Sequence, residues 1–330
     1  MGIKCAKTAG FCYGVKRAVD EAYRMADGNI RFATLGELIH NKFVVDDLEA
    51  HGIRAYDSVS NIPDGTKVIL RTHGVAKSVI DDLEKRGIEY IDLTCPFVEK
   101  IHKIVKKYHD EGYQIVIVGD KNHPEVKGIN GWCDNSALII YEQDTKFIEK
   151  IDKKPVCIVA QTTINRKIFG QIVQNIKNTC QTPIVFDTIC SATGERQREA
   201  DELSRESDIM FVIGGAHSSN TKKLYEICKE NCPETYLIET SEDIPQSIYK
   251  NKRIGITAGA STPGCIIEEV FTTMDEKIKT EENFAELFAQ YESKSLNNGD
   301  IIEGTVAEVR GNEVIVELDG FKYNGQLAAD

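Results

Sequence analysis

The fold and the candidate chemistry both depend on the stretch Ile91-Asp92-Leu93-Thr94-Cys95-Pro96-Phe97-Val98. A short apolar run ends there in a cysteine, and Pro96 follows directly. Because proline is favoured at the first position of a helix, the stretch predicts a strand, then a helix with Cys95 at its start. Unpaired N–H groups at a helix N-terminus stabilise a thiolate, so this placement favours a metal ligand or a nucleophile over a core cysteine.

The same pattern occurs at two other cysteines. Cys12 precedes the amphipathic segment 15–25, and Cys190 precedes the polar helical run 194–205. Cys12 and Cys95 are 83 positions apart, and Cys95 and Cys190 are 95 positions apart. Each interval is about the length of a small α/β lobe. The spacing predicts three lobes in a pseudo-threefold arrangement, each of which contributes one cysteine to a shared centre.

Short apolar runs alternate with helical patterns over the first 280 residues, which is typical of α/β units with parallel sheets. The number of runs favours several small sheets over one large sheet. The predicted fold class is therefore α/β, with three small parallel-sheet lobes. The predicted strands are 31–35, 67–71, 90–93, 114–119, 137–141, 156–160, 183–186, 209–214, 235–238 and 253–257. The helices predicted between them include 78–86, 98–109, 167–178, 221–229 and 266–277.

Polar side chains that suit an anion occur in the strand-to-helix turns, where parallel sheets bind their ligands. Imidazole, hydroxyl and amide groups beside helix N-termini favour a phosphate or a diphosphate. Each of these groups alone is also typical of a helix N-cap, so only their convergence supports an anion site. The turn residues are His40, His73, His123, Thr162, Thr163, Ser218, Ser219, Asn220 and Ser261.

Three cysteines in matched turns suggest a metal site with an open coordination position. A closed zinc or iron–sulfur site normally takes four protein ligands. Three ligands are consistent with a 4Fe-4S cluster that has one iron open to substrate, or with a three-ligand zinc that keeps a bound water. Three unrelated buried cysteines are the alternative, which their equivalent placement disfavours.

Glu125 shares its turn with His123 and follows Pro124 at a predicted helix start. A carboxyl group buried near a metal site can have a raised pKa and deliver protons, with Thr162 or a neighbouring hydroxyl as a relay. A glutamate in the first helical turn also complements the helix dipole without any catalytic role. The residues alone favour this second interpretation.

The composition is that of an ordinary globular protein, with 41% hydrophobic and 28% charged residues. A formal net charge of −12 argues against binding nucleic acid or anionic membrane over the whole surface. No apolar run approaches the roughly 18 residues of a membrane span, and the N-terminus lacks a signal-peptide core. We expect a cytoplasmic protein with no membrane partner, whose ten cysteines are ligands, catalytic groups or core residues rather than disulfides.

Nine short motifs follow one another in residues 1–279. They are Gly10-Phe11-Cys12-Tyr13-Gly14-Val15, Ile39-His40-Asn41, Thr72-His73-Gly74-Val75, Thr94-Cys95-Pro96, His123-Pro124-Glu125-Val126, Gln161-Thr162-Thr163, Ile189-Cys190, Ser218-Ser219-Asn220 and Thr257-Ala258-Gly259-Ala260-Ser261. This ordered set resembles the 4-hydroxy-3-methylbut-2-enyl diphosphate reductase family, which carries out the last step of the methylerythritol phosphate route to isoprenoids.

The resemblance implies three α/β lobes around a 4Fe-4S cluster held by Cys12, Cys95 and Cys190, with the substrate hydroxyl at the fourth iron. It implies two electrons from a ferredoxin or a flavodoxin, and protons routed by Glu125 with Thr162. The hydroxyl would leave as water, which gives isopentenyl and dimethylallyl diphosphate. Thr162 is preferred to Thr163 because it is the first threonine of the matching turn. The implied diphosphate ligands are His40, His73, His123, Ser218, Ser219, Asn220 and Ser261.

The chain is expected to divide into six parts. The first is a strand with a cysteine turn, which packs with the third lobe; three α/β lobes, an acidic linker and a tail follow. The tail resembles the first half of an OB-fold RNA-binding repeat of the type found in a small-subunit ribosomal protein, as if cut part-way. It has seven acidic residues against Arg310 and Lys322, so RNA binding is doubtful. The expected boundaries are 1–13, 14–95, 96–189, 190–280, 281–298 and 299–330.

Two functions from other classes compete with the reductase. A cluster-dependent hydro-lyase also needs three cysteines and an open iron, but it works without net electron transfer. An RNA-associated protein would depend on the tail rather than on the lobes. Dependence of turnover on a reductant distinguishes the reductase from the hydro-lyase. Removal of residues 299–330 distinguishes it from the RNA-associated protein, because unchanged activity would leave the tail without a catalytic role.

Overall fold

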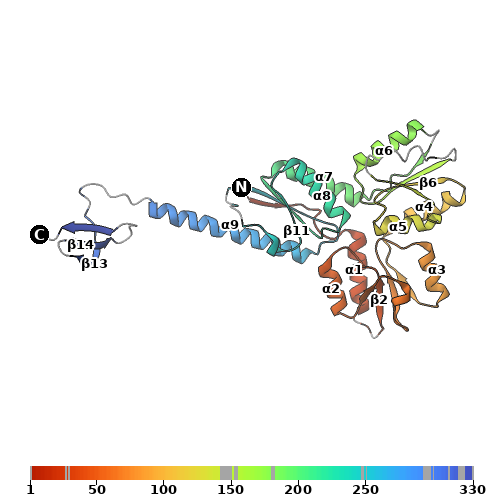
Figure 1. The fold of residues 1–330 in the computed structure, drawn as a ribbon, viewed down its shortest axis with the longest axis horizontal. Coiled ribbons are helices and arrows are strands. Elements are labelled where there is room, and N and C mark those ends of the chain that lie inside the picture. The colour runs from red at the N-terminus through yellow and green to blue at the C-terminus, as the bar shows by residue number, and fades with distance from the viewer. Residues whose placement is uncertain are drawn as a thin grey trace. The chain divides into compact units, whose positions relative to one another are not determined.

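Three four-stranded parallel sheets form one compact unit, residues 1–245 and 251–271 (Figure 1). The alternation of apolar runs and helical patterns predicts this α/β class, and the fold confirms it. The computed structural model describes residues 2–26, 28, 30–141, 151, 155–179, 183–246, 249, 251–292, 299, 301–310, 313–318 and 324–328.

The three sheets share one strand order. In each sheet the second strand of the lobe lies at one edge and the first strand lies next to it, so their order in space is the reverse of their order in the sequence. The orders are β3-β2-β4-β5, β7-β6-β8-β9 and β11-β10-β12-β1. In the third sheet the last position is taken by β1 (Gly2–Cys5), which pairs in parallel with β12 (Arg253–Ala258). The two ends of this unit therefore meet in one sheet, and the lobe pattern repeats three times.

The first lobe begins after Cys12 and ends at Cys95. The Asn41 side chain caps its second helix by accepting a hydrogen bond from the Val44 N–H at 3.2 Å. The short strand Arg54–Tyr56 is absent from the prediction because Arg-Ala-Tyr contains no apolar run. The elements of this lobe are α1 (Tyr13–Ala26), β2 (Phe32–Leu35), α2 (Lys42–Ala50), β3 (Arg54–Tyr56), β4 (Lys67–Leu70), α3 (Lys77–Lys85) and β5 (Tyr90–Asp92).

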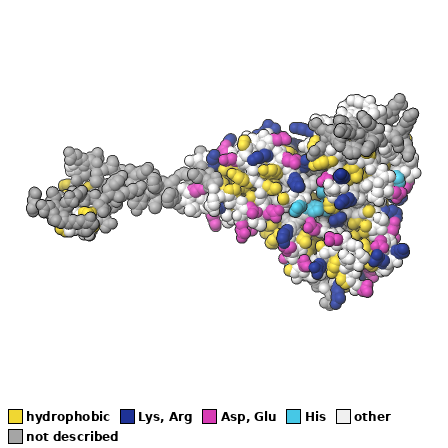
Figure 2. Space-filling model, in the orientation of Figure 1, with side chains coloured by type: hydrophobic (Ala, Val, Ile, Leu, Met, Phe, Trp, Pro, Cys, Tyr) yellow, Lys and Arg dark blue, Asp and Glu magenta, His cyan; other side chains and the backbone are white. Residues whose placement is uncertain are grey.

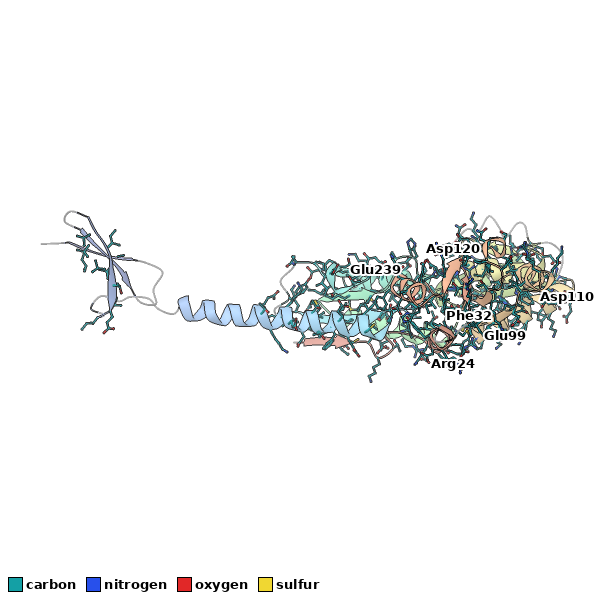
Figure 3. The ribbon with its side chains drawn as sticks, turned by 90° about the horizontal axis from the view of Figure 1, so that it is seen from below. Arg24, Phe32, Glu99, Asp110, Asp120 and Glu239 are labelled. Atoms are coloured by element: carbon teal, nitrogen blue, oxygen red, sulfur yellow. The ribbon has the colours of Figure 1, made fainter. Side chains whose placement is uncertain are left out.

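The second lobe begins with a helix whose N-cap is Cys95 and whose first residue is Pro96, as predicted. Its central strand Val156–Ala160 is buried along its whole length, as expected for a parallel strand covered by helices on both faces. Asp120 follows the carboxyl end of the neighbouring strand and is labelled in Figure 3. The elements are α4 (Pro96–Asp110), β6 (Gln114–Val118), α5 (Pro124–Asn130), β7 (Leu138–Ile140), β8 (Val156–Ala160), α6 (Arg166–Thr179) and β9 (Ile184–Val185).

The third lobe begins with a helix whose N-cap is Cys190. Cys228 and Cys232 pack in its core. Among the described residues, no helix is long and apolar enough to cross a membrane. The elements are α7 (Ser191–Glu206), β10 (Ile209–Ile213), α8 (Ser219–Asn231), β11 (Thr235–Ile238), β12 and the start of α9 (Gly264–Glu292).

The second unit comprises residues 246–250 and 272–330. The predicted linker 281–298 continues α9 as far as Glu292, and residues 293–298 lie outside the described part of the chain. Three antiparallel strands follow, with a β-bulge between Val306 and Glu308. Their resemblance to an OB-fold stays a prediction. The strands are β13 (Gly304–Arg310), β14 (Glu313–Leu318) and β15 (Asn324–Ala328).

Candidate active site

One cavity lies where the three lobes meet, with about 100 Å³ of space for the centres of water-sized molecules. All twelve side chains predicted for the site line it, although they come from strand-to-helix turns spread over about 250 residues of sequence. On the face drawn in Figure 2, histidine side chains are gathered near the middle of the three-lobed unit. The lining includes Cys12, Cys95, Cys190, His40, His73, His123, Glu125, Thr162, Ser218, Ser219, Asn220 and Ser261.

The three cysteines occupy equivalent positions in the three lobes. Each follows an edge strand, precedes a helix and donates its backbone N–H to a carbonyl just beyond the neighbouring strand. Cys95 binds the carbonyl of Thr72 at 3.0 Å, and Cys190 binds that of Thr162 at 3.0 Å. Cys12 binds the carbonyl of Ala260 at 3.2 Å. These bonds connect each cysteine turn to the turn that carries polar cavity residues of the same lobe.

Burial and the helix starts act in opposite directions on the pKa values of Cys95 and Cys190. Burial raises the pKa of Cys95, backbone N–H groups of the helix start lower it, and the neighbouring thiols Cys12 and Cys190 raise it again. Burial likewise raises the pKa of Cys190, against two N–H groups of its own helix start. A bound cation removes the cost of placing several thiolates together. The three side chains therefore fit a metal centre with three thiolate ligands.

A glycine keeps space beside the sulfur of Cys95. A Cβ atom added at Gly14 would lie 2.5 Å from the Cys95 Sγ atom, closer than any van der Waals contact allows. Gly14 lies in the first turn of α1, and its backbone φ does not require glycine. The absence of a side chain there is explained by the close approach of the thiol.

Three histidines form the second part of the site. The ring centroids of His40 and His73 are 4.4 Å apart, and both lie about 5.5 Å from that of His123. Burial lowers the pKa of His123 to about 4 and that of His73 well below its ordinary value, so both rings are neutral at pH 7. The His123 Nδ1 atom accepts the Glu125 N–H at 3.1 Å, which leaves its Nε2–H as a donor.

Several polar atoms in this cavity have no partner among the described residues. They are Nε2 of His40, Nδ1 of His73 and both amide atoms of Asn220. Buried polar atoms are normally hydrogen-bonded, so a group of unpaired polar atoms in a cavity indicates a site for a polar ligand. The hydroxyl of Ser219 lies 3.0 Å from that of Thr163, and the Ser261 hydroxyl donates to the His40 carbonyl at 3.1 Å.

Glu125 is the only carboxylate among the lining residues of the cavity. It is 2% exposed, and burial raises its pKa to about 7 despite two hydrogen bonds from Thr162. The backbone N–H of Thr162 binds Oε1 at 2.7 Å, and its hydroxyl binds Oε2 at 2.7 Å. A carboxyl group with this pKa can exchange protons near neutral pH. The contact with Glu125 is made by Thr162, whereas Thr163 bonds with Ser219 and Gln161.

The sequence prediction missed some of the surroundings of the site. Phe97 and Thr193, from the first turns of α4 and α7, also line the cavity. Arg196 is 3% exposed and lies on α7 six residues after Cys190. The run 194–205 is rich in charged residues and shows no apolar period, so its buried arginine could not be distinguished from solvent-exposed ones.

A family model described as LytB protein matches residues 3–275. A 4-hydroxy-3-methylbut-2-enyl diphosphate reductase of Caldanaerobacter subterraneus subsp. tengcongensis is 47% identical over an alignment of 289 positions that covers 85% of this chain and 97% of the relative. The reductase of Clostridioides difficile is 45% identical over 278 residues, 83% of this chain and 99% of the relative.

A longer relative extends the match to the second unit. The Clostridium acetobutylicum protein with the same description is 44% identical over an alignment of 336 positions that covers 98% of this chain and 52% of the relative. The chain thus spans about half the length of that protein.

Two solved structures share the fold. One is a structure of (E)-4-hydroxy-3-methyl-but-2-enyl diphosphate reductase, the terminal enzyme of the non-mevalonate pathway; it is 40% identical, with a TM-score of 0.63 over 84% of this chain and 100% of that one. The other is the reductase of Plasmodium falciparum, 28% identical, with a TM-score of 0.74 over 86% of this chain and 87% of that one.

Proposed function

This chain belongs to the LytB protein family, and we propose on that premise that it reduces 4-hydroxy-3-methylbut-2-enyl diphosphate in the cavity between its three lobes. The observation that carries the proposal is the composition of the cavity. Three thiols, three imidazoles and one buried carboxyl group with a pKa of about 7 line the same space. In the proposed reaction the allylic C–O bond breaks, the oxygen leaves as water, and two electrons and two protons are consumed. The products would be isopentenyl and dimethylallyl diphosphate.

Cys12, Cys95 and Cys190 would hold a 4Fe-4S cluster. In a cluster with three protein ligands, one of the four irons has no protein ligand. Such a cluster, when the chain binds it, would supply electrons and a Lewis acid for the substrate hydroxyl. The three cysteine turns support this role because each cysteine directly precedes a helix, and backbone N–H groups of the helix start act on the thiols of Cys95 and Cys190. We propose a ferredoxin or a flavodoxin as the source of the two electrons.

The diphosphate would be bound by the unpaired polar groups of the same cavity. Neutral His73 and His123 can donate ring N–H groups, and Asn220 offers an amide with no internal partner. The N-terminus of α8 adds backbone donors beside Ser218 and Ser219. Holding the diphosphate fixes the position of the allylic carbon, and a positioned reactant needs less ordering in the transition state. The proposed ligands are His40, His73, His123, Ser218, Ser219, Asn220 and Ser261.

Glu125 would deliver the proton that converts the leaving hydroxyl to water. With a pKa of about 7, a large fraction of its carboxyl groups carry a proton at neutral pH. Thr162 fixes both carboxyl oxygens, and its hydroxyl can relay the proton because it can both donate and accept. An ordinary surface glutamate would be ionised at this pH and could not act as an acid.

The test is turnover under anaerobic conditions with and without an electron donor. The purified chain is incubated with 4-hydroxy-3-methylbut-2-enyl diphosphate and dithionite-reduced methyl viologen, and the products are identified by NMR. We expect both diphosphate products with the donor and none without it. Conversion of the substrate without any donor would contradict a reductase and favour a hydro-lyase.

A further inference from the structure

Arg196 is a buried cation without a carboxylate partner among the described residues. Its side chain has one described hydrogen bond, from Nη1 to the carbonyl of Ala258 at 3.4 Å, and its Nε has none. Arg205, on the same helix, shows the ordinary alternative, because it is exposed and pairs with Asp201 at 2.9 Å. A guanidinium stays charged in proteins, so burying one requires negative charge nearby.

The nearest acidic residue on the same face of α7 serves another purpose. Glu199 accepts the backbone N–H groups of Lys7 and Thr8 at 2.7 and 2.9 Å and the Thr8 hydroxyl at 2.5 Å. These bonds fix the loop between β1 and Cys12. Glu199 therefore holds the start of the cysteine turn, and all its hydrogen bonds go to that loop.

The other groups whose charges act on Arg196 are two of the three site cysteines. Burial lowers the pKa of Arg196, whereas charges on Cys12, Glu199 and Cys190 raise it. The contact with the Ala258 carbonyl places the guanidinium beside the Cys12 turn, because Ala260, two residues later, accepts the Cys12 N–H at 3.2 Å. Charges on cysteines of two lobes thus act on Arg196, which lies beside the turn that holds Cys12.

We propose that Arg196 is a positioning residue that offsets the negative charge of the three-cysteine centre and favours its reduced state. This inference rests on the proposed function. Each electron that enters the centre adds one negative charge, and a fixed cation in a poorly solvated site stabilises that charge. Net charge and hydrogen bonding around the sulfurs are known to set the reduction potentials of iron–sulfur clusters. Loss of the guanidinium charge should therefore make the centre harder to reduce.

The test compares midpoint potentials of the cluster-loaded proteins by redox titration monitored by EPR. R196Q keeps an N–H donor for the Ala258 carbonyl but removes the charge, and R196K keeps the charge. R198Q is the matched control, since Arg198 lies on the same helix with an exposed side chain. We expect the equilibrium constant for reduction to fall at least tenfold in R196Q, which is about 59 mV for one electron. R196K and R198Q should stay within about threefold of the wild type, or less than 30 mV.

Other results would overturn the proposal. An unchanged midpoint potential in R196Q would do so. An equal fall of the midpoint potential in R196K and R196Q would also do so, because the geometry of the side chain rather than its charge would then matter. Circular dichroism of the metal-free proteins checks folding, and an R196Q protein that unfolds would assign Arg196 a structural role instead. A folded R196Q that loses the cluster while R196K retains it supports charge compensation. A wild type without iron and sulfide would contradict the proposed function itself.

Discussion

Thr162 binds both carboxyl oxygens of Glu125, one through its backbone N–H and one through its hydroxyl, each at 2.7 Å. The Thr162 carbonyl accepts the Cys190 N–H at 3.0 Å, and the Glu125 N–H donates to His123 at 3.1 Å. One continuous set of hydrogen bonds therefore connects a proposed diphosphate ligand, the proposed acid and a proposed cluster ligand. A change at any of these residues should affect the others.

Glu125→Gln should abolish proton delivery without loss of the metal centre. A general acid typically increases the rate of the catalysed step about 10²- to 10⁴-fold, so we expect kcat of the variant to fall roughly hundredfold or more. In the wild type, kcat should decline as pH rises above about 7, because the acid role requires the protonated carboxyl group. Steady-state assays between pH 5.5 and 9, with iron analysis of both proteins, check this. Substantial activity in the variant would refute the role.

The same carboxyl group should make stability depend on pH. Its pKa is about 7 in the folded chain against an ordinary value of 4.5, so between these values the folded state binds more protons than the unfolded state. The stability that protonation provides is complete below pH 4.5 and is lost as pH rises through 7, a difference of about 3 kcal/mol. Urea unfolding of the metal-free wild type and E125Q at pH 5 and 8 measures it. Parallel pH dependence in the two proteins would contradict the raised pKa.

Gly14→Ala should displace the sulfur of Cys95. The added Cβ would lie 2.5 Å from Sγ, although alanine is otherwise favoured over glycine within a helix. We expect reduced iron and sulfide content in G14A. Gly170→Ala is the matched control, because α6 has open space at that position. Full cluster loading in G14A would show that the thiol moves aside without consequence.

Asn220→Asp should weaken binding of the diphosphate. The Asn220 amide is buried and has no described partner, and the substitution places a carboxylate where an anion is proposed to bind. We expect a rise in KM of about tenfold or more, because close like charges cost over 1 kcal/mol. Inhibition by inorganic diphosphate should weaken in parallel. Asn178→Asp, exposed on α6, serves as the control; equal effects at both positions would reject the diphosphate subsite.

The sequence predicted the lobes and the lining of the cavity because both depend on local signals. Apolar runs mark the buried strands, and a cysteine followed by proline or by a polar run marks the starts of α4 and α7. The prediction failed where local signals are weak. The strand Arg54–Tyr56 has only three residues and is held by pairing with β2 rather than by its own composition.

The surroundings of the site were harder to predict than the site itself. Which arginine of α7 is buried depends on how the helix packs against the loop before Cys12, a contact between residues more than 190 positions apart. The pKa of Glu125 is likewise set by complete burial and by Thr162, neither of which follows from a glutamate beside a proline. Long-range packing therefore decides the charges of the site.

The central claim is that Cys12, Cys95 and Cys190 hold a 4Fe-4S cluster on which the reduction depends. The most direct measurement is iron and sulfide analysis after anaerobic purification, combined with donor-dependent turnover, for the wild type and Cys95→Ser. We predict about four iron and four sulfide per wild-type chain with activity, and loss of the cluster and of activity in C95S. A colourless, iron-free wild type that is folded and fully active would contradict the account.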